Sequence, residues 1–128
     1  MFSEIGKDVV IGNNTRIGAQ CFIPENVIIG DNVFIGPKVC FTNDKYPPAG
    51  QECWAFTYVE DGAAIGAGSI ILPSVCIGSK ALVGAGSVVT KSIPPGEVWC
   101  GNPAKFIKKM DAVKELREGL AKKTVVNG

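Results

Sequence analysis

An apolar residue recurs every six positions through most of this chain, and this period constrains the fold more than any other feature of the sequence. The positions that keep one phase are Ile5, Ile11, Ile17, Ile23, Ile29, Ile35, Ile65, Ile71, Ile77, Val83 and Val89. An α-helix would distribute residues at this spacing over several faces. A period of six instead indicates a parallel β-helix, in which short strands alternate with bends.

Each six-residue unit supplies the residues that such a coil needs. A small residue stands two positions before most anchors, where it points inward beside them; these residues are Val9, Thr15, Cys21, Val27, Val33, Val39, Ser69, Val75, Ala81 and Ser87. Gly follows most anchors and relieves crowding at the bend. Asn and Asp, at positions 13, 14, 26, 31 and 32, tolerate left-handed backbone and suit the corners. Three units close a triangle, and stacked triangles bury a core that no single unit could bury.

The repeat is interrupted once and then ends. Two prolines and a glycine, Pro47, Pro48 and Gly50, prevent a central strand from continuing. We therefore predict a loop over about 43–57 that leaves the prism and returns near Val59. Apolar residues over 104–123 have helical spacing, which predicts an amphipathic helix that caps the open end of the coil. The expected organisation is one domain, with the β-helix at 1–103 and a C-terminal helix and tail at 104–128.

Composition excludes several classes of function. The formal net charge is only +1, which gives no electrostatic basis for binding nucleic acid. The chain has no long apolar run and no basic leader at its start, so no membrane association and a cytoplasmic location are expected. No histidine is present, which excludes a histidine-ligated zinc site, and we expect no metal.

The five cysteines are odd in number and form no Cys-x-x-Cys pair. We expect Cys21 and Cys76 to fill small inward positions of the repeat as reduced thiols. Cys53 lies in the predicted loop, where a catalytic thiol would have no histidine to activate it, so a structural role is favoured.

Two segments extend this interpretation beyond the period. The run Gly-Ala-Gly-Ser-Val-Val-Thr-Lys at 84–91 and Gly-Asn-Pro-Ala-Lys at 101–105 resemble the left-handed β-helix acyltransferases. The segment 39–47, followed by Trp54 and Thr57, resembles the nucleotide-sugar N-acetyltransferases within that group. The resemblance implies an all-β fold, a left-handed parallel β-helix. It also implies transfer of an acetyl group from acetyl-CoA to the amino group of a UDP- or dTDP-linked amino sugar. Enzymes of this kind are homotrimers with sites between neighbouring prisms.

The same resemblance suggests roles for individual residues. Asn43 would hold the acceptor near the thioester, and Asp44 would accept a proton or orient the amine; both residues are also common turn formers. Candidates for contact with the acceptor are Arg16, Tyr46 and Trp54. Candidates for contact with coenzyme A are Ala67, Gly68, Ala85, Gly86, Lys91, Asn102, Pro103 and Lys105. Gly and Ala at bends would let the pantetheine arm lie close to the backbone, and the lysines would meet phosphates.

Two alternatives stay open. The absence of histidine favours N-acetylation, because a neutral amine is already nucleophilic and an alcohol needs a base. A carboxylate such as Asp44 could serve as that base, so O-acetylation of a sugar or small alcohol is the second hypothesis. The third is a non-catalytic trimeric scaffold, which would need neither the loop nor the Gly-Asn-Pro-Ala-Lys turn.

Overall fold

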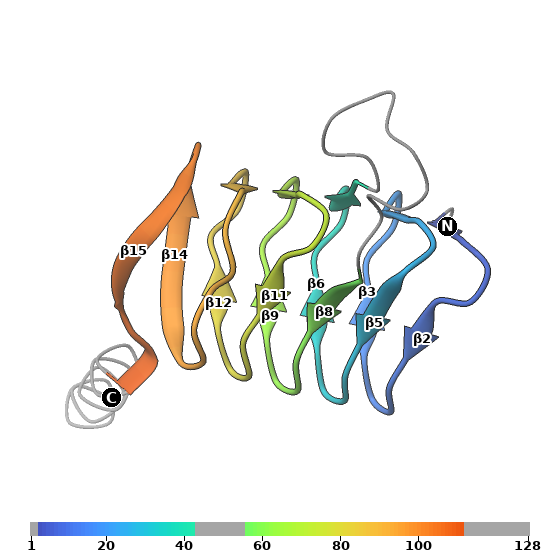
Figure 1. Cartoon of the computed structure of the whole chain (residues 1–128), viewed down its shortest axis with the longest axis horizontal. Coiled ribbons are helices and arrows are strands. Elements are labelled where there is room, and N and C mark those ends of the chain that lie inside the picture. Colours follow the sequence, from blue (N-terminus) through green and yellow to red (C-terminus); the bar gives the residue numbers. More distant parts are fainter. Residues whose placement is uncertain (1–2, 43–55, 112–128) are drawn as a thin grey trace, which may run out of the picture.

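The structure is a computed structural model that describes residues 3–42 and 56–111 (Figure 1). These residues form a three-sided prism of short strands. The strands are β1 (Glu4–Ile5), β2 (Val10–Ile11), β3 (Arg16–Ile17), β4 (Phe22–Ile23), β5 (Val27–Ile29), β6 (Phe34–Ile35), β7 (Cys40–Phe41), β8 (Thr57–Val59), β9 (Ala64–Ile65), β10 (Ile70–Ile71), β11 (Cys76–Ile77), β12 (Leu82–Val83), β13 (Val88–Val89), β14 (Glu97–Gly101) and β15 (Ala104–Lys109). The chain is a left-handed parallel β-helix: the six-residue period predicts the parallel β-helix, and the resemblance implies its left hand.

Three sheets form the sides of the prism. The first sheet has the order β1-β4-β7-β10-β13, the second β11-β8-β5-β2, and the third β15-β14-β12-β9-β6-β3. All pairs are parallel except β14 with β15, which form an antiparallel hairpin. One turn of the coil advances 18 residues, since Glu4 pairs with Phe22 and Arg16 with Phe34. The six-residue period therefore corresponds to one side of the triangle, as expected.

The anchors fill the interior of the prism. Ile23, Ile35, Ile65, Ile71, Ile77, Val83 and Val89 are completely buried. The small residues two positions earlier lie beside them, and even the hydroxyl-bearing Ser69 and Ser87 are completely buried. Their hydroxyls satisfy backbone groups, because both donate to the carbonyl oxygen of Gly84, at 3.1 and 2.6 Å. The core predicted from the period is confirmed.

Bends recur at a fixed position in each unit. The third residue after most anchors, and after the buried Val59 and Ile93, has a positive φ: Asp8, Asn14, Gln20, Asn26, Asn32, Lys38, Gly62, Gly68, Ser74, Lys80, Gly86 and Gly96. Three of the five predicted corner residues, Asn14, Asn26 and Asn32, stand in this position. Asp31 stabilises its corner differently, since its Oδ1 accepts the Asn13 N–H at 2.7 Å. Glycine just after an anchor serves close approach: a Cβ at Gly66 would lie 2.5 Å from the Ala85 nitrogen.

The interruption falls where the sequence places it. Residues 43–55 lie outside the described residues, and the chain re-enters the prism at Thr57, the first residue of β8. Thr57 is buried, so the predicted loop extends one residue too far at this end. No helix in the described part of the chain is long and apolar enough to cross a membrane.

Two predictions are wrong. Residues 104–109 form strand β15 and not the start of a helix, because they pair with β14 across the Gly101–Ala104 turn. Helical structure is present at Met110 and Asp111, and the remainder of the predicted helix lies outside the described residues. Cys76 does not fill an inward position: it directly precedes the anchor Ile77, so its side chain lies on the outer face, whereas Cys21 is buried as predicted.

Candidate coenzyme A site

Four of the predicted coenzyme A residues lie in one column. Ala67–Gly68 and Ala85–Gly86 occupy successive bends between the third and the first sheet, and we call this column the glycine corner. The two bends are in direct contact, since the Gly86 N–H donates to the Ala67 carbonyl oxygen at 2.8 Å. The Gly68 N–H donates in the same way to Pro37 at 3.0 Å. All four residues are exposed.

The glycine corner carries almost no side-chain atoms. The backbone conformation of the bends does not by itself require glycine. Gly68 and Gly86 have φ values of 73° and 70°, in the left-handed region. Equivalent bends hold Asn, Asp, Gln, Ser or Lys with similar φ values between 57° and 67°. A Cβ built at Gly68 or Gly86 would meet no atom within 4 Å. The fold thus accepts larger residues here, and glycine leaves the backbone of this corner open to a ligand.

The glycine corner leads to the turn of the β14–β15 hairpin. Buried Ser87, one position after Gly86, accepts the Gly101 N–H on its Oγ at 3.2 Å. Asn102 and Pro103 follow in the turn and are exposed. The structure therefore brings the predicted Asn102 and Pro103 to the end of the same column.

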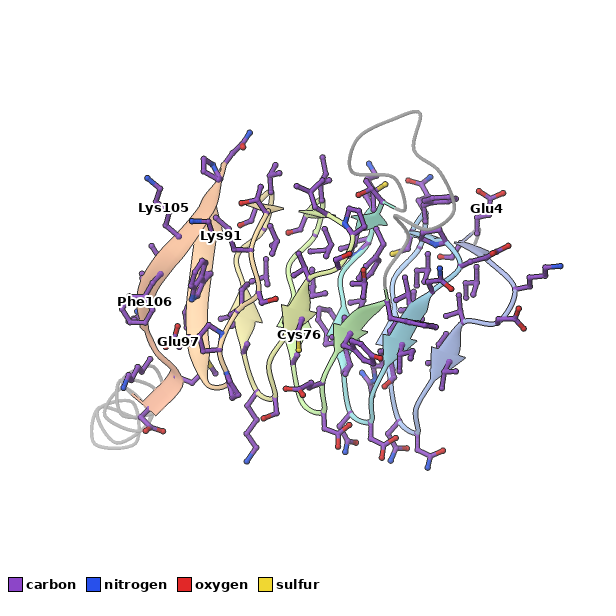
Figure 2. The ribbon with its side chains drawn as sticks, in the orientation of Figure 1. Glu4, Cys76, Lys91, Glu97, Lys105 and Phe106 are labelled. Atoms are coloured by element: carbon purple, nitrogen blue, oxygen red, sulfur yellow. The ribbon has the colours of Figure 1, made fainter. Side chains whose placement is uncertain are left out.

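A hollow of about 260 Å³ lies beside this turn. It is located where the first sheet ends at β13 while the third sheet continues into β14 and β15. The lining residues are Thr90, Lys91, Trp99, Pro103, Ala104, Lys105 and Phe106. Figure 2 shows Lys91 and Lys105 at the same end of the prism, with Phe106 further along β15. The two predicted lysines are therefore brought together by the segment that follows β13 and by β15.

The hollow combines positive charge with aromatic surface. Lys91 and Lys105 are exposed, so their ammonium groups can turn toward a ligand. Trp99 is half-buried against the core, and its indole N–H donates to Glu97 Oε1 at 2.9 Å. Phe106 faces Trp99 across the hairpin and is 48% exposed. Ammonium groups beside aromatic rings suit a ligand that has both phosphates and a planar base.

The sequence did not identify four residues of the hollow, Thr90, Trp99, Ala104 and Phe106. Trp99, Ala104 and Phe106 were missed because the segment from Ala104 was assigned to a helix, and nothing in the sequence singles out Thr90. The signal that could have found the first three is the Gly101-Asn102-Pro103 turn, interpreted as the turn of a hairpin between two β-prone segments. With that turn recognised, Trp99 and Phe106 become cross-strand neighbours of one hairpin.

The predicted acceptor and catalytic residues are not brought to this hollow. Arg16 lies on β3 at the opposite edge of the third sheet, four strand spacings from β14, or roughly 19 Å. Asn43, Asp44, Tyr46 and Trp54 lie outside the described residues, as does Cys53. The neighbouring Thr42 is described, and its Oγ1 donates to the Ile71 carbonyl oxygen at 3.1 Å. Asn43 therefore follows a residue that is fixed to the first sheet.

A second hollow, of about 330 Å³, lies over the second sheet and includes Tyr58, Glu60 and Asp61. Its carboxylates already bond to the backbone: Asp61 Oδ1 accepts the Asp31 N–H at 2.7 Å, and Glu60 Oε1 accepts the Ser79 N–H at 3.1 Å. Cys76 lies in β11 of the same sheet. Burial and the nearby Glu60 charge raise the pKa of its thiol. These carboxylates join successive turns, so this hollow has a structural explanation.

Comparison with known proteins agrees with the fold. A stretch of 60 residues is 38% identical to a 2,3,4,5-tetrahydropyridine-2,6-dicarboxylate N-acetyltransferase of Staphylococcus aureus. The stretch covers 47% of this chain and 25% of that protein. Among solved structures, the Neisseria gonorrhoeae serine acetyltransferase superposes with a TM-score of 0.69 at 30% identity, covering 80% of this chain and 38% of that one. The polySia-specific acetyltransferase NeuO also gives 0.69, at 31% identity, covering 80% and 48%.

The chain thus spans a quarter of the length of this curated relative and less than half of these two structures. The match to a sequence family is more extensive. Residues 8–43 and 56–91 match the bacterial transferase hexapeptide family, described by six repeats, and these ranges contain most of the strands of all three sheets. Because the matched residues make up more than half of the chain and form the observed coil, the protein belongs to the bacterial transferase hexapeptide family.

Proposed function

We propose that the protein transfers an acetyl group from acetyl-CoA to the amino group of a UDP- or dTDP-linked amino sugar. The observation that carries the donor assignment is the continuity between the glycine corner and the hollow with Lys91 and Lys105. The pantetheine arm would lie along the exposed backbone of the corner, and the phosphates would meet the two lysines. The aromatic surface of Trp99 and Phe106 would contact the base. No step needs a metal.

The direction of the donor follows from this arrangement. With its nucleotide end in the hollow, coenzyme A extends along the glycine corner toward earlier turns. Its thioester then lies in the part of the prism where β7 and β10 pair, and Asn43 follows two residues after β7. The glycine corner precedes the first-sheet strands β10 and β13, whereas Thr42, the last described residue before Asn43, follows the opposite end of the first-sheet strand β7. A site that uses both is therefore completed by a neighbouring prism, which supports a homotrimer with sites between subunits.

The acceptor assignment depends on the absence of histidine. An amine attacks a thioester once it is neutral, so positioning by Asn43 and proton acceptance by Asp44 would be sufficient. The Staphylococcus relative is named as an N-acetyltransferase, which agrees with a nitrogen acceptor. The sugar-nucleotide class comes from the resemblance of 39–47, Trp54 and Thr57 to enzymes with that substrate. Arg16, Tyr46 and Trp54 would contact it, and both substrates would be met in the cytoplasm.

O-acetylation is the second candidate, and a specific observation favours it. The structural neighbours include serine acetyltransferases, one of them named as a serine O-acetyltransferase of Brucella melitensis, which aligns at 27% identity with a TM-score of 0.65. In that reaction Asp44 would act as the base that an alcohol requires. The non-catalytic scaffold is the third candidate, and the open glycine corner argues against it.

The test is a thiol-release assay with acetyl-CoA and a panel of UDP- and dTDP-linked 3-amino and 4-amino sugars, with the matching hydroxyl sugars and serine as controls. Turnover on one amino sugar supports the proposal, and turnover only on a hydroxyl acceptor replaces it with O-acetylation. Asn43→Ala should reduce turnover strongly without changing the melting temperature. Protein that binds no coenzyme A in calorimetry would support the scaffold.

A further inference from the structure

Side chains at the small inward positions join one turn of the coil to the next. In the described part of the chain, four residues that stand two positions before an anchor donate to a backbone carbonyl oxygen fifteen residues later. The pairs are Ser3 with Gly18, Thr15 with Gly30, Cys21 with Gly36 and Ser69 with Gly84, at 2.9, 2.7, 3.2 and 3.1 Å. Each acceptor directly follows an anchor, so this hydrogen bond is a regular element of the stacking.

Ser87 departs from this rule. It stands two positions before Val89 and is completely buried, but fifteen residues later the chain has left the coil and reaches Asn102 in the turn of the β14–β15 hairpin. Its hydroxyl donates back to the Gly84 carbonyl oxygen at 2.6 Å, and its Oγ accepts the Gly101 N–H at 3.2 Å. Through Ser87, the second bend of the glycine corner is therefore bonded to the hairpin turn.

This hydroxyl lies where the parallel pairing of β12 with β14 stops. The Gly84 N–H donates to the Trp99 carbonyl oxygen at 2.9 Å, so a continuing parallel ladder would next join the Gly101 N–H to the Gly84 carbonyl oxygen. Both of these groups bond to the Ser87 hydroxyl. A hydroxyl can take this place because it donates one proton and accepts on its lone pairs. Ser87 thus extends the contact between coil and hairpin by one step.

The two segments joined in this way are the two that would contact coenzyme A. Ser87 directly follows Gly86, which is exposed in the glycine corner, and Gly101 directly precedes Asn102 and Pro103, which are exposed in the hairpin turn. Pro103 also lines the hollow with the two lysines. Ser87 itself is buried and does not reach a ligand. Its hydroxyl instead sets the spacing between the corner and the turn.

We propose that Ser87 is a positioning residue for coenzyme A, because it holds the hairpin turn at the spacing that lets one ligand span the glycine corner and the hollow. This role rests on the proposed function, which assigns coenzyme A to these two segments. A ligand with contacts at two places binds more tightly when their spacing is fixed beforehand, since ordering the protein on binding costs affinity. Loss of the hydroxyl loosens the link and leaves each segment in place.

The experiment compares Ser87→Ala with Ser69→Ala in calorimetry of the full chain. Both serines are completely buried, both follow a left-handed glycine of the glycine corner, and both donate to Gly84. Of the two, Ser87 alone accepts the Gly101 N–H. Ser87→Ala should raise the Kd for coenzyme A about 3- to 10-fold. Adenosine 3′,5′-bisphosphate contains only the nucleotide end, so its Kd should change less than about twofold. Ser69→Ala should leave both values unchanged.

Amide hydrogen exchange of the ligand-free chain gives an independent readout. The Gly101 N–H should exchange faster in Ser87→Ala and at the wild-type rate in Ser69→Ala. Ser87→Thr is the conservative rescue, since Thr15 stands in the equivalent position. The Thr15 hydroxyl donates to a backbone carbonyl oxygen and accepts the Val33 N–H, at 2.7 and 3.2 Å. Ser87→Thr should therefore keep the wild-type exchange rate and the wild-type affinity.

Three outcomes overturn the proposal. Wild-type affinity of Ser87→Ala for coenzyme A would show that the hydroxyl does not set the spacing. Equal weakening of coenzyme A and of the nucleotide would show general damage to the hollow, and equal weakening in Ser69→Ala would show an effect of lost stability. Wild-type protein that binds no coenzyme A refutes the proposed function and, with it, the role of Ser87 in binding. The two failures are distinguishable because the wild type binds in the first case.

Discussion

Gly68 and Gly86 lie one turn apart on the same corner of the prism, both with left-handed φ values and both with no atom within 4 Å of the point where a side chain would begin. Asn, Ser and Lys occupy the same backbone conformation at other corners. These two glycines therefore do more than allow a bend: they leave a strip of backbone amide and carbonyl groups exposed beside the hollow of Lys91 and Lys105.

Filling this strip should block the donor without unfolding the prism. Gly86→Asn introduces a residue that Asn14, Asn26 and Asn32 show to be compatible with this bend. We expect the Kd for coenzyme A to rise at least tenfold, or about 1.4 kcal/mol, with the melting temperature within about 4 °C of the wild type. Calorimetry and thermal melts measure both. Ser74→Asn, at an equivalent bend on another corner, is the control that should leave affinity unchanged.

The lysines of the hollow should contribute separately. Lys91→Ala and Lys105→Ala each remove one charge that would meet a phosphate, so we expect the Kd for coenzyme A to rise about 3- to 10-fold for each. The loss should shrink at high salt, because exposed charges are screened. Titration of coenzyme A at two ionic strengths checks this. Lys80→Ala, an exposed lysine on a different corner, should bind normally; equal weakening there would point to a general charge effect.

Adding one methyl group to the glycine that follows an anchor should destabilise the fold, because the next turn of the coil packs directly against this glycine. In Gly66→Ala the new Cβ would lie 2.5 Å from the Ala85 nitrogen and 2.8 Å from its Cα, and backbone cannot move aside as a side chain can. We expect the free energy of unfolding to fall by about 3 kcal/mol. Urea denaturation measures the change. Gly68→Ala, which meets open space and has only the left-handed φ to accommodate, should cost about 1 kcal/mol.

The Cys76 thiol should respond to Glu60. Burial and then the Glu60 charge raise the pKa of this thiol, so less thiolate is present at a given pH. Glu60→Gln removes the charge and keeps an oxygen that can accept the Ser79 N–H. The thiol pKa should fall, and alkylation of Cys76 at pH about 8 should become faster.

Peptide mass spectrometry follows this reaction residue by residue. Cys40, whose pKa is raised by burial alone, is the internal reference and should react at the same rate in both proteins. An unchanged rate at Cys76 would show that Glu60 does not act on the thiol.

Several features could be predicted from local sequence because the coil repeats. The anchor at position 29, its small partner at 27 and the bend at 32 recur with the same chemistry in each unit, so each unit indicates the same conformation. The end of the coil is different. Residues 104–109 have apolar spacing that fits a helix, and pairing with β14 overrides that preference, as tertiary context often does for short segments. Cys76 was misplaced by one position, which in a strand changes the face of the side chain.

The sequence by itself determined the period, the inward anchors, the position of the interruption and the residue types at the bends, because each depends on residues within one six-residue unit. Only the tertiary structure decided which bends share a corner and that Lys91 meets Lys105 beside Trp99. It also decided that Ile5 and Ile11 remain exposed while identical anchors are buried. Bends on one corner lie one or more turns apart, and Lys91 meets Lys105 through the β14–β15 hairpin, so these relationships follow from the stacking of 18-residue turns and from where that stacking ends.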